Sequence, residues 1–190
     1  RFHLKIIFHI FFKDFNRIIN DNNYLTKNLH IENKKKLYRD FLSKVLFYLN
    51  KKFNITFVDT DRLIEVREAM ALEDIKKKNG YMYIRKIEEE IIMSLSNSQK
   101  IISTGGSAVY SNKAMNYLSS ISEIIFINTS LEIIKDRIGI NPERGLASPS
   151  GESIDNIFME RLPLYNKWSE IEINGNQDIS AVAEELLNKL

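Results

Sequence analysis

The stretch Ile101-Ile102-Ser103-Thr104-Gly105-Gly106 places two glycines directly after an apolar, β-branched run. Such a run predicts a buried strand, and the glycines predict a tight turn at its end. Backbone N–H groups can approach a ligand closely at such a turn because no Cβ is in the way, although a strand-to-helix turn would use glycine for its backbone angles alone. The stretch therefore predicts one strand of an α/β sheet with a candidate binding turn at its carboxyl end.

Further apolar strands and amphipathic segments alternate on both sides of this stretch. Strands are expected at 55–58, 123–127 and 170–173, and helices at 42–53, 61–78, 83–95, 112–118, 131–137, 153–162 and 179–190. This alternation favours a parallel sheet flanked by helices, whose ligands bind beyond the carboxyl ends of the strands. Because Asp59, Asp61, Gly105 and Gly106 all follow strand ends, we expect them to meet at one edge.

The size and composition predict one domain of ordinary character. The 190 residues, 44% of them hydrophobic, suffice for one α/β core, and a monomer is expected at this size. The lack of cysteine excludes disulfides and thiolate metal sites, so a cytoplasmic location is the default. The apolar start, Arg1–Phe12, is shorter than the roughly 20 residues of a membrane span and contains Lys5 and His9. We interpret it as a buried strand or as a segment outside the fold.

The first forty residues differ from the rest in composition. Residues 1–40 contain no Ala, Gly, Ser, Val or Pro, and the chain begins with Arg. A fragment, a faulty gene start or a frameshift would each produce this, so we expect an atypical segment at 1–40 and the domain proper at 41–190. Residues 1–58 also hold 12 Lys and Arg against 4 Asp and Glu, but no RNA- or DNA-binding motif accompanies them. We therefore expect no nucleic-acid partner.

Two carboxylates stand one residue apart after the strand expected at 55–58. Asp59 and Asp61 could hold a hydrated Mg²⁺ or accept a hydrogen bond from a substrate hydroxyl. The plainer interpretation makes Asp61 a helix N-cap and Asp59 a turn residue.

Two arginines are candidates for binding anions. Arg85 and Glu88 are three residues apart on an expected helix. Arg85 could therefore bind the carboxylate of a substrate, while Glu88 holds the Arg85 side chain in place. Arg144 lies in a segment rich in Gly, Pro and Ser, where it could close on a transferring phosphate. An exposed ion pair and a solvated arginine are the ordinary alternatives.

The order of these motifs resembles that of the shikimate kinases. The matching pieces run from about residue 57 to the C-terminus: Asp59-Thr60-Asp61, the Arg85 and Glu88 pair, Ser103-Thr104-Gly105-Gly106, Arg137, Arg144 and Arg161-Leu162-Pro163-Leu164-Tyr165. The resemblance implies a three-layer P-loop NTPase-like fold and ATP-dependent phosphorylation of the 3-hydroxyl of shikimate.

The resemblance also implies a shikimate site. The residues on this side are Asp61, Arg85, Glu88, Gly105, Gly106 and Arg161. Arg85 and Arg161 would hold the carboxylate of shikimate, and Asp61 would orient or deprotonate the attacking hydroxyl.

On the ATP side, the resemblance implies that Asp59 helps to hold Mg²⁺. Ser103 ends its strand where a P-loop enzyme has a group near the metal. Arg137 would lie against the nucleotide, and Arg144 would be the lid arginine acting on the phosphate.

The sequence departs from the family pattern most at the phosphate loop. GxxxxGK[ST] occurs nowhere, and the first glycine of the chain is Gly80. The loop lysine would fall near Leu42, where Ser43 and Lys44 offer no glycine-based phosphate nest. We therefore expect little or no kinase activity.

Smaller departures also lie near the expected site. Ser107 replaces a third glycine, Gly145 follows Arg144 where proline is commoner, and Tyr81 stands where an acid is usual. Three alternatives stay open: a non-catalytic module that binds a small acid, a decayed or mis-started kinase, and a kinase for another small hydroxy acid.

Overall fold

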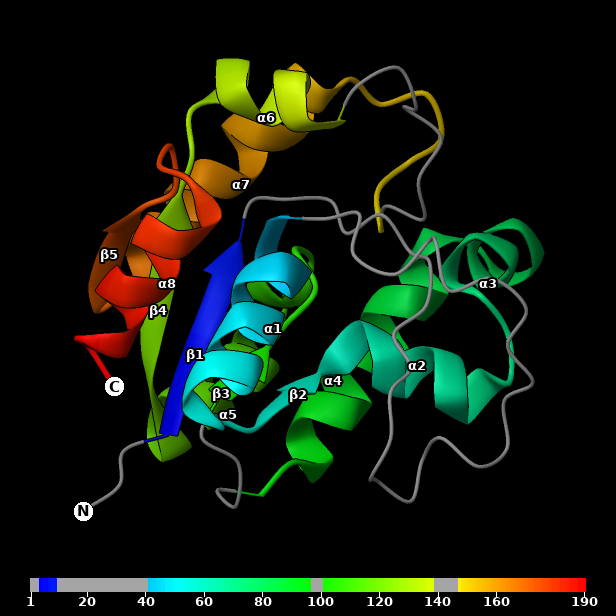
Figure 1. Cartoon of the computed structure of the whole chain (residues 1–190). Helices are drawn as coiled ribbons and strands as arrows, with labels where there is room; N and C mark the ends of the chain where they lie inside the picture. Colours follow the sequence, from blue (N-terminus) through cyan, green and yellow to red (C-terminus); the bar gives the residue numbers. More distant parts are fainter. Residues whose placement is uncertain (1–3, 10–40, 97–100, 139–146) are drawn as a thin grey trace, which may run out of the picture.

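Five parallel strands form the centre of the protein, whose computed structural model describes residues 4–9, 41–96, 101–138 and 147–190. Their order across the sheet is β2-β3-β1-β4-β5 (Figure 1). The strands are β1 (Leu4–His9), β2 (Phe57–Asp59), β3 (Ile101–Ser103), β4 (Ser122–Asn128) and β5 (Ile171–Asn174). The expected parallel sheet is confirmed, with strand ends shifted by one or two residues.

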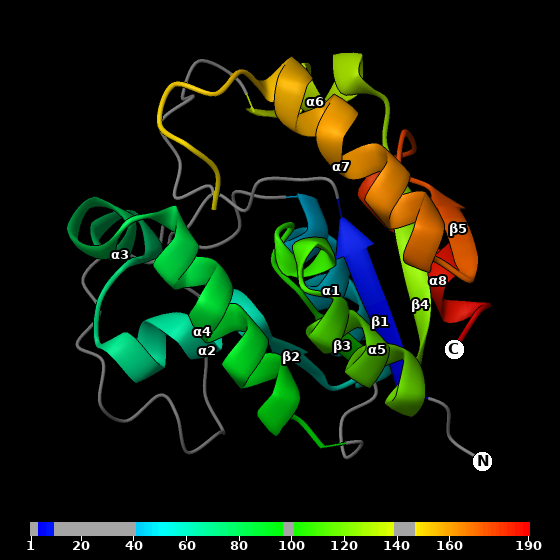
Figure 2. The same cartoon turned by 180° about the vertical axis from the view of Figure 1, so that it is seen from behind.

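Helices cover both faces of this sheet. They are α1 (Phe41–Phe53), α2 (Thr60–Glu68), α3 (Leu72–Asn79), α4 (Tyr81–Ser94), the 3₁₀ helix η1 (Ala108–Tyr110), α5 (Asn112–Ile121), α6 (Leu131–Ile138), α7 (Ile154–Trp168) and α8 (Ile179–Leu187). Helices α1 and α8 lie on one face, and α5 and α7 lie on the other (Figure 2). The expected three-layer arrangement is therefore present.

The sheet separates two hydrophobic cores because successive strand residues face opposite sides. In β3, Ile101 packs with α1 and α8, whereas its neighbour Ile102 packs with α5 and α7. A third cluster joins α2, α3 and α4 beyond the β2 edge, around Ile64, Ile75 and Ile87. This third cluster carries two of the expected site helices, α2 and α4.

The strand β1 takes the middle position in the sheet. Ile6 is in register with Ile102 of β3 and with Ile124 of β4. The sequence analysis interpreted the apolar start as a buried strand or as a segment outside the fold, and the structure shows a strand at Leu4–His9. Most of residues 1–40 lie outside the described residues, so the boundary at residue 40 stays a prediction.

The single helix expected at 61–78 is wrong, because the chain forms α2 and α3 with a turn between them. Ala69 takes a left-handed conformation (φ 50°) and ends α2, and the N–H of Met70 donates to the Glu65 carbonyl. The Glu65 carboxylate then accepts from the N–H of Leu72 at the start of α3. Ala69-Met70-Ala71 contains neither the glycine nor the asparagine usual at such a position, so this turn could not be predicted from the sequence.

The helix α7 also differs from expectation, because it continues through Pro163 rather than ending at Leu162. Proline removes one helical hydrogen bond, to the carbonyl of the residue four positions earlier. That residue, Met159, is exposed, which leaves water as a substitute partner for its carbonyl. The continuous helix places Arg161 and Tyr165 on one buried stripe.

The described part of the chain contains no helix that is both long and apolar enough to cross a membrane.

Glu65 gives the α2–α3 turn a pH dependence. Burial raises the pKa of this 9% exposed carboxyl from 4.5 to about 7. The folded state therefore binds more protons than the unfolded state between these values, and stability falls as the pH rises through that window. The loss should reach about 3 kcal/mol above pH 7.

We predict that Glu65→Gln flattens this dependence and raises the free energy of unfolding at pH 8. Urea unfolding between pH 4.5 and 8 measures the free energy of unfolding of each variant. Glu184→Gln, at an exposed position on α8, is the control. An unchanged pH slope in Glu65→Gln would contradict the assignment.

Candidate functional site

The strands β2 and β3 end side by side and begin the site. Asp59 of β2 is in register with Ser103 of β3. The Asp59 carboxylate caps α2, accepting from the N–H groups of Asp61 (3.0 Å) and Arg62 (3.4 Å). The N-cap is thus Asp59, not Asp61 as in the plainer interpretation, and Asp61 lies in the first turn of α2, whose dipole favours negative charge.

Gly105 brings three elements into contact. Its N–H donates to the hydroxyl of Thr60 at 3.0 Å. A Cβ on this residue would lie 2.5 Å from Asp61 Oδ1 and 2.6 Å from Glu88 Oε1. Both carboxylates are buried, with Asp61 8% and Glu88 1% exposed. Space, rather than backbone angle, therefore requires glycine here, since its φ is not positive.

Ser107 accounts for part of the environment of Glu88. Its hydroxyl donates to Glu88 Oε2, and Ser107 itself is buried. The residue that replaces the third glycine of the resemblance thus binds a carboxylate of the expected site.

The sequence analysis expected Glu88 to hold Arg85 in place, but the structure gives Arg85 other partners. Among the described residues no ion pair joins Arg85 to Glu88; instead, Arg85 Nε donates to the carbonyl of Ala147 at 3.0 Å. The Arg85 guanidinium also stacks on Tyr110, with 3.7 Å between Cζ and the ring centroid. The i,i+3 spacing placed the two side chains near each other but could not show which partners each would take.

Arg161 meets the same tyrosine. Its Cζ lies 5.4 Å from the centroid of Tyr110, and its Nε donates to the Tyr110 hydroxyl at 3.3 Å. Arg161 is only 2% exposed. The structure therefore brings Arg85 and Arg161 together around one ring, as one carboxylate held by both would require.

Tyr165 supports the glycine turn from α7. Its hydroxyl donates to the carbonyl of Gly106 at 2.6 Å, and its ring stacks on Phe126 with centroids 5.2 Å apart. Burial raises the pKa of Tyr165 to about 12, so the phenol keeps its proton and remains a donor.

Arg137 lies away from this group, against the turn after β5. It donates to the carbonyls of Gly175 (2.8 Å) and Gln177 (2.9 Å). A Cβ on Gly175 would overlap the hydroxyl of Thr129, so this turn packs tightly on the end of β4. A pocket of about 330 Å³ at the same strand ends is lined by Asn128, Ser130, Glu172, Asn174 and Asn176.

The neighbouring residues Asp59 and Ser103 fit a magnesium ion that retains water. The Ser103 hydroxyl is buried and has no hydrogen-bond partner among the residues that the structure describes. Mg²⁺ in phosphoryl-transfer sites takes one or two carboxylates, with water and substrate phosphates as its other ligands. Within the described ranges no three acidic or histidine side chains gather to hold a metal by themselves, so such an ion would depend on the phosphates.

Two parts of the expected phosphate side are not among the described residues. Arg144 lies outside the described residues, as does the segment 10–40 between β1 and α1. The backbone at Leu42, Ser43 and Lys44 belongs to the first turn of α1.

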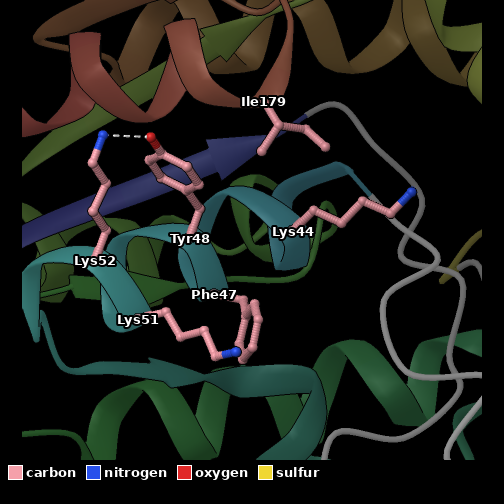
Figure 3. A pocket seen from close by; sticks show the side chains of 6 residues that line it. All are labelled: Lys44, Phe47, Tyr48, Lys51, Lys52 and Ile179. Atoms are coloured by element: carbon pink, nitrogen blue, oxygen red, sulfur yellow. Dashed lines mark hydrogen bonds between the residues drawn. The ribbon is translucent and has the colours of Figure 1, made fainter.

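The helix α1 borders another hollow. A pocket of about 390 Å³ is lined by Lys44, Phe47, Tyr48, Lys51, Lys52 and Ile179 (Figure 3). In it, the ammonium of Lys52 donates to the Tyr48 hydroxyl at 2.7 Å. None of the expected shikimate-site residues lines this pocket.

Four contributors were missed by the sequence analysis: Thr60, Ser107, Tyr110 and Tyr165. Thr60 and Tyr165 lie inside motifs of the resemblance, so their position could have drawn attention to them. Ser107 was noted only as a departure. Tyr110 carried no signal, since a tyrosine five residues after Gly105 is unremarkable without the fold.

Comparison with known proteins connects this geometry to one family. The shikimate kinase family model matches residues 43–190. The shikimate kinase of Aquifex aeolicus is 32% identical over 143 residues, covering 75% of this chain and 84% of that protein. That of a Sulfurihydrogenibium species is 32% identical over 144 residues, covering 75% and 86%.

Solved structures agree with this match. The crystal structure of the Aquifex aeolicus shikimate kinase has a TM-score of 0.67 at 25% identity, over 97% of this chain and 94% of that one. The Acinetobacter baumannii enzyme, solved in complex with shikimate, has a TM-score of 0.68 at 21% identity, over 77% and 84%. At that lower identity the second likeness supports the fold alone. The P-loop NTPase-like fold is thereby confirmed.

We predict that Gly105→Ala destabilises the protein by about 1 to 3 kcal/mol, because the added methyl overlaps two buried carboxylates. Chemical unfolding measures the change. Gly151→Ala is the comparison variant: nothing lies within 4 Å of its added Cβ, so it measures the backbone strain of alanine at φ +81° without a steric overlap. An alanine at position 105 that costs no stability would show that α2 and α4 do not close on β3 in this way.

Proposed function

Because this chain belongs to the shikimate kinase family, we propose that its site binds shikimate and orients the 3-hydroxyl for phosphorylation by ATP. Members of this family are kinases that take shikimate and ATP as substrates, with Mg²⁺. The proposal for this chain extends to a cytoplasmic monomer without a nucleic-acid partner.

One observation carries the proposal: the contact of Gly105 with the carboxylates of Asp61 and Glu88, beside two arginines on one tyrosine. Shikimate is a small ring with a carboxylate at one end and hydroxyls at the other. Guanidinium groups suit the carboxylate, and buried carboxylates suit hydroxyl donors. The opposite charges of the site thus match the two ends of the ligand.

Each group then has a separate task. Arg85 and Arg161 hold the carboxylate and fix the orientation of the ring. Asp61 accepts a hydrogen bond from the 3-hydroxyl and takes its proton as the oxygen attacks the γ-phosphorus of ATP, whose bond to the β-phosphate oxygen breaks to release ADP. The turn at Gly106, held by Tyr165, lets the backbone approach the ligand closely.

The nucleotide side is proposed from fewer residues. Asp59 and Ser103 would hold Mg²⁺, which neutralises phosphate charge when bound. Arg137 would border the nucleotide, and Arg144 would act on the transferring phosphate. Because the sequence contains no GxxxxGK[ST], the phosphate nest is missing, and we propose slow transfer or none.

A non-catalytic module that binds a small acid is the second candidate. The same missing motif favours it, because the acceptor residues are present while the phosphate-binding residues are not. A kinase for another small hydroxy acid is favoured by the bond from Ser107 to Glu88, which changes the hydrogen-bonding capacity of a site carboxylate. Shikimate binding, measured first, separates these candidates.

We predict that shikimate binds and that Arg85→Ala weakens binding by about 1.5 to 3 kcal/mol, because charge-assisted hydrogen bonds are lost. Isothermal titration calorimetry at low salt measures it. Arg67→Ala is the matched control, since this arginine pairs with Glu90 on the outer surface. Equal affinity of Arg85→Ala and wild type would remove Arg85 from the site.

We predict that Mg·ATP binds weakly or not at all to this chain. Calorimetric titration tests it, and a dissociation constant in the low micromolar range would contradict our account of the missing motif.

We predict that phosphoryl transfer recovers when residues 10–43 are replaced by Gly-x-x-x-x-Gly-Lys-Ser, which joins β1 to α1 by a phosphate loop. Shikimate-dependent ATP consumption is measured beside a matched kinase. A folded, repaired protein without it would mean that shikimate is the wrong substrate or that the acceptor site is inactive. Adding Arg144→Ala to an active repair should lower kcat far more than shikimate affinity.

A further inference from the structure

We propose that Tyr110 is a positioning residue for the substrate carboxylate: its ring holds the Arg85 guanidinium and its hydroxyl holds Arg161. The inference rests on the proposed function, in which these two arginines bind the carboxylate of shikimate. It assigns Arg85 a support other than the glutamate expected from the sequence.

The two arginines come from separate elements, and Tyr110 contacts both. Arg85 belongs to α4 and Arg161 to α7, while Tyr110 ends η1, which packs on both helices. Both guanidinium carbons lie within 6 Å of the ring centroid, the range in which a cation is attracted to an aromatic face. This attraction offsets the repulsion between two cations that a single carboxylate must draw together.

The contacts of Arg85 leave one side of its guanidinium for a ligand. The stack at 3.7 Å fixes the plane of the group, and Nε is used by the Ala147 carbonyl. Among the described residues neither Nη atom of Arg85 has a hydrogen-bond acceptor. A planar group that is held by its face and by Nε, with neither terminal nitrogen bonded within the described residues, is preorganised for a carboxylate.

Glu88 does not supply this support. Its Oε2 accepts from Ser107, and within the described residues no ion pair connects it to Arg85. Tyr81 lies on Arg85 at 5.1 Å, a longer contact than that of Tyr110. Tyr110 is therefore the closer of the two rings on the Arg85 guanidinium and, through its hydroxyl, a direct partner of Arg161.

The test compares shikimate with its methyl ester, which keeps the ring and hydroxyls but has no charge. Calorimetry on Tyr110→Leu should show shikimate affinity about 10-fold lower, given the usual strength of a cation–π contact. Affinity for the ester should change less than about 2-fold, because the arginines act on the charge. Tyr110→Phe keeps the stack but loses the bond to Arg161, and a loss of about 3-fold is expected.

The control is Tyr117→Phe, whose lost hydroxyl donates to the Leu95 carbonyl away from the site. It should leave both affinities unchanged. Equal weakening of acid and ester in Tyr110→Leu would mean a structural role only and would overturn the proposal, as would unchanged shikimate affinity.

A second measurement needs no ligand. The side-chain protons of Arg85 should show a ring-current shift by NMR in wild type and Tyr110→Phe, and lose most of it in Tyr110→Leu. If wild type binds neither shikimate nor ester, the proposed function fails, and with it the carboxylate as the ligand of this pair. If shikimate binds but Tyr110→Leu leaves the Arg85 shift unchanged, only the role of Tyr110 fails.

Discussion

The absence of a side chain at Gly105 is the constraint on which the site depends. The turn after β3 can approach α2 and α4 only because no Cβ stands between Gly105 and the carboxylates of Asp61 and Glu88. The bond from the Gly105 N–H to Thr60 then fixes the spacing between the two strand ends. Since α2 and α4 belong to a cluster beyond the sheet edge, this contact also joins that cluster to the sheet.

A chain of polar contacts extends from this turn to the arginines. Tyr165 donates to Gly106, and one turn earlier on the same helix Arg161 reaches Tyr110, whose ring holds Arg85. Burying Arg161 almost completely is costly unless its charge finds partners. The Tyr110 hydroxyl and ring are two of the partners that lower this cost.

The sequence predicted the sheet, its parallel strands and the proximity of Asp61 to Gly105 at one edge, because hydrophobic periodicity and strand ends are local features. The helix boundary at Ala69 was mispredicted because the backbone and side chain of Glu65 bind the turn that follows, and no glycine or asparagine marks that turn in the sequence. The predicted side-chain contact between Arg85 and Glu88 was also wrong. The i,i+3 spacing of Arg85 and Glu88 can be seen in the sequence. Their actual partners cannot, because Tyr110 reaches Arg85 and Ser107 reaches Glu88 only when η1 packs on α4.

The acceptor and phosphate sides of the site differ in what they require from the chain. The proposed acceptor side draws its groups from α2, α4, α7 and the turn after β3, so its geometry follows from packing among well-separated segments. A phosphate nest instead requires consecutive glycine-permitted backbone angles in one loop, and no packing elsewhere can replace them. A chain without the phosphate nest can thus still bind the acid although it no longer transfers phosphate. Positioning and charge neutralisation provide most of the catalysis of phosphoryl transfer, so a chain that orients the acceptor alone retains recognition and loses rate.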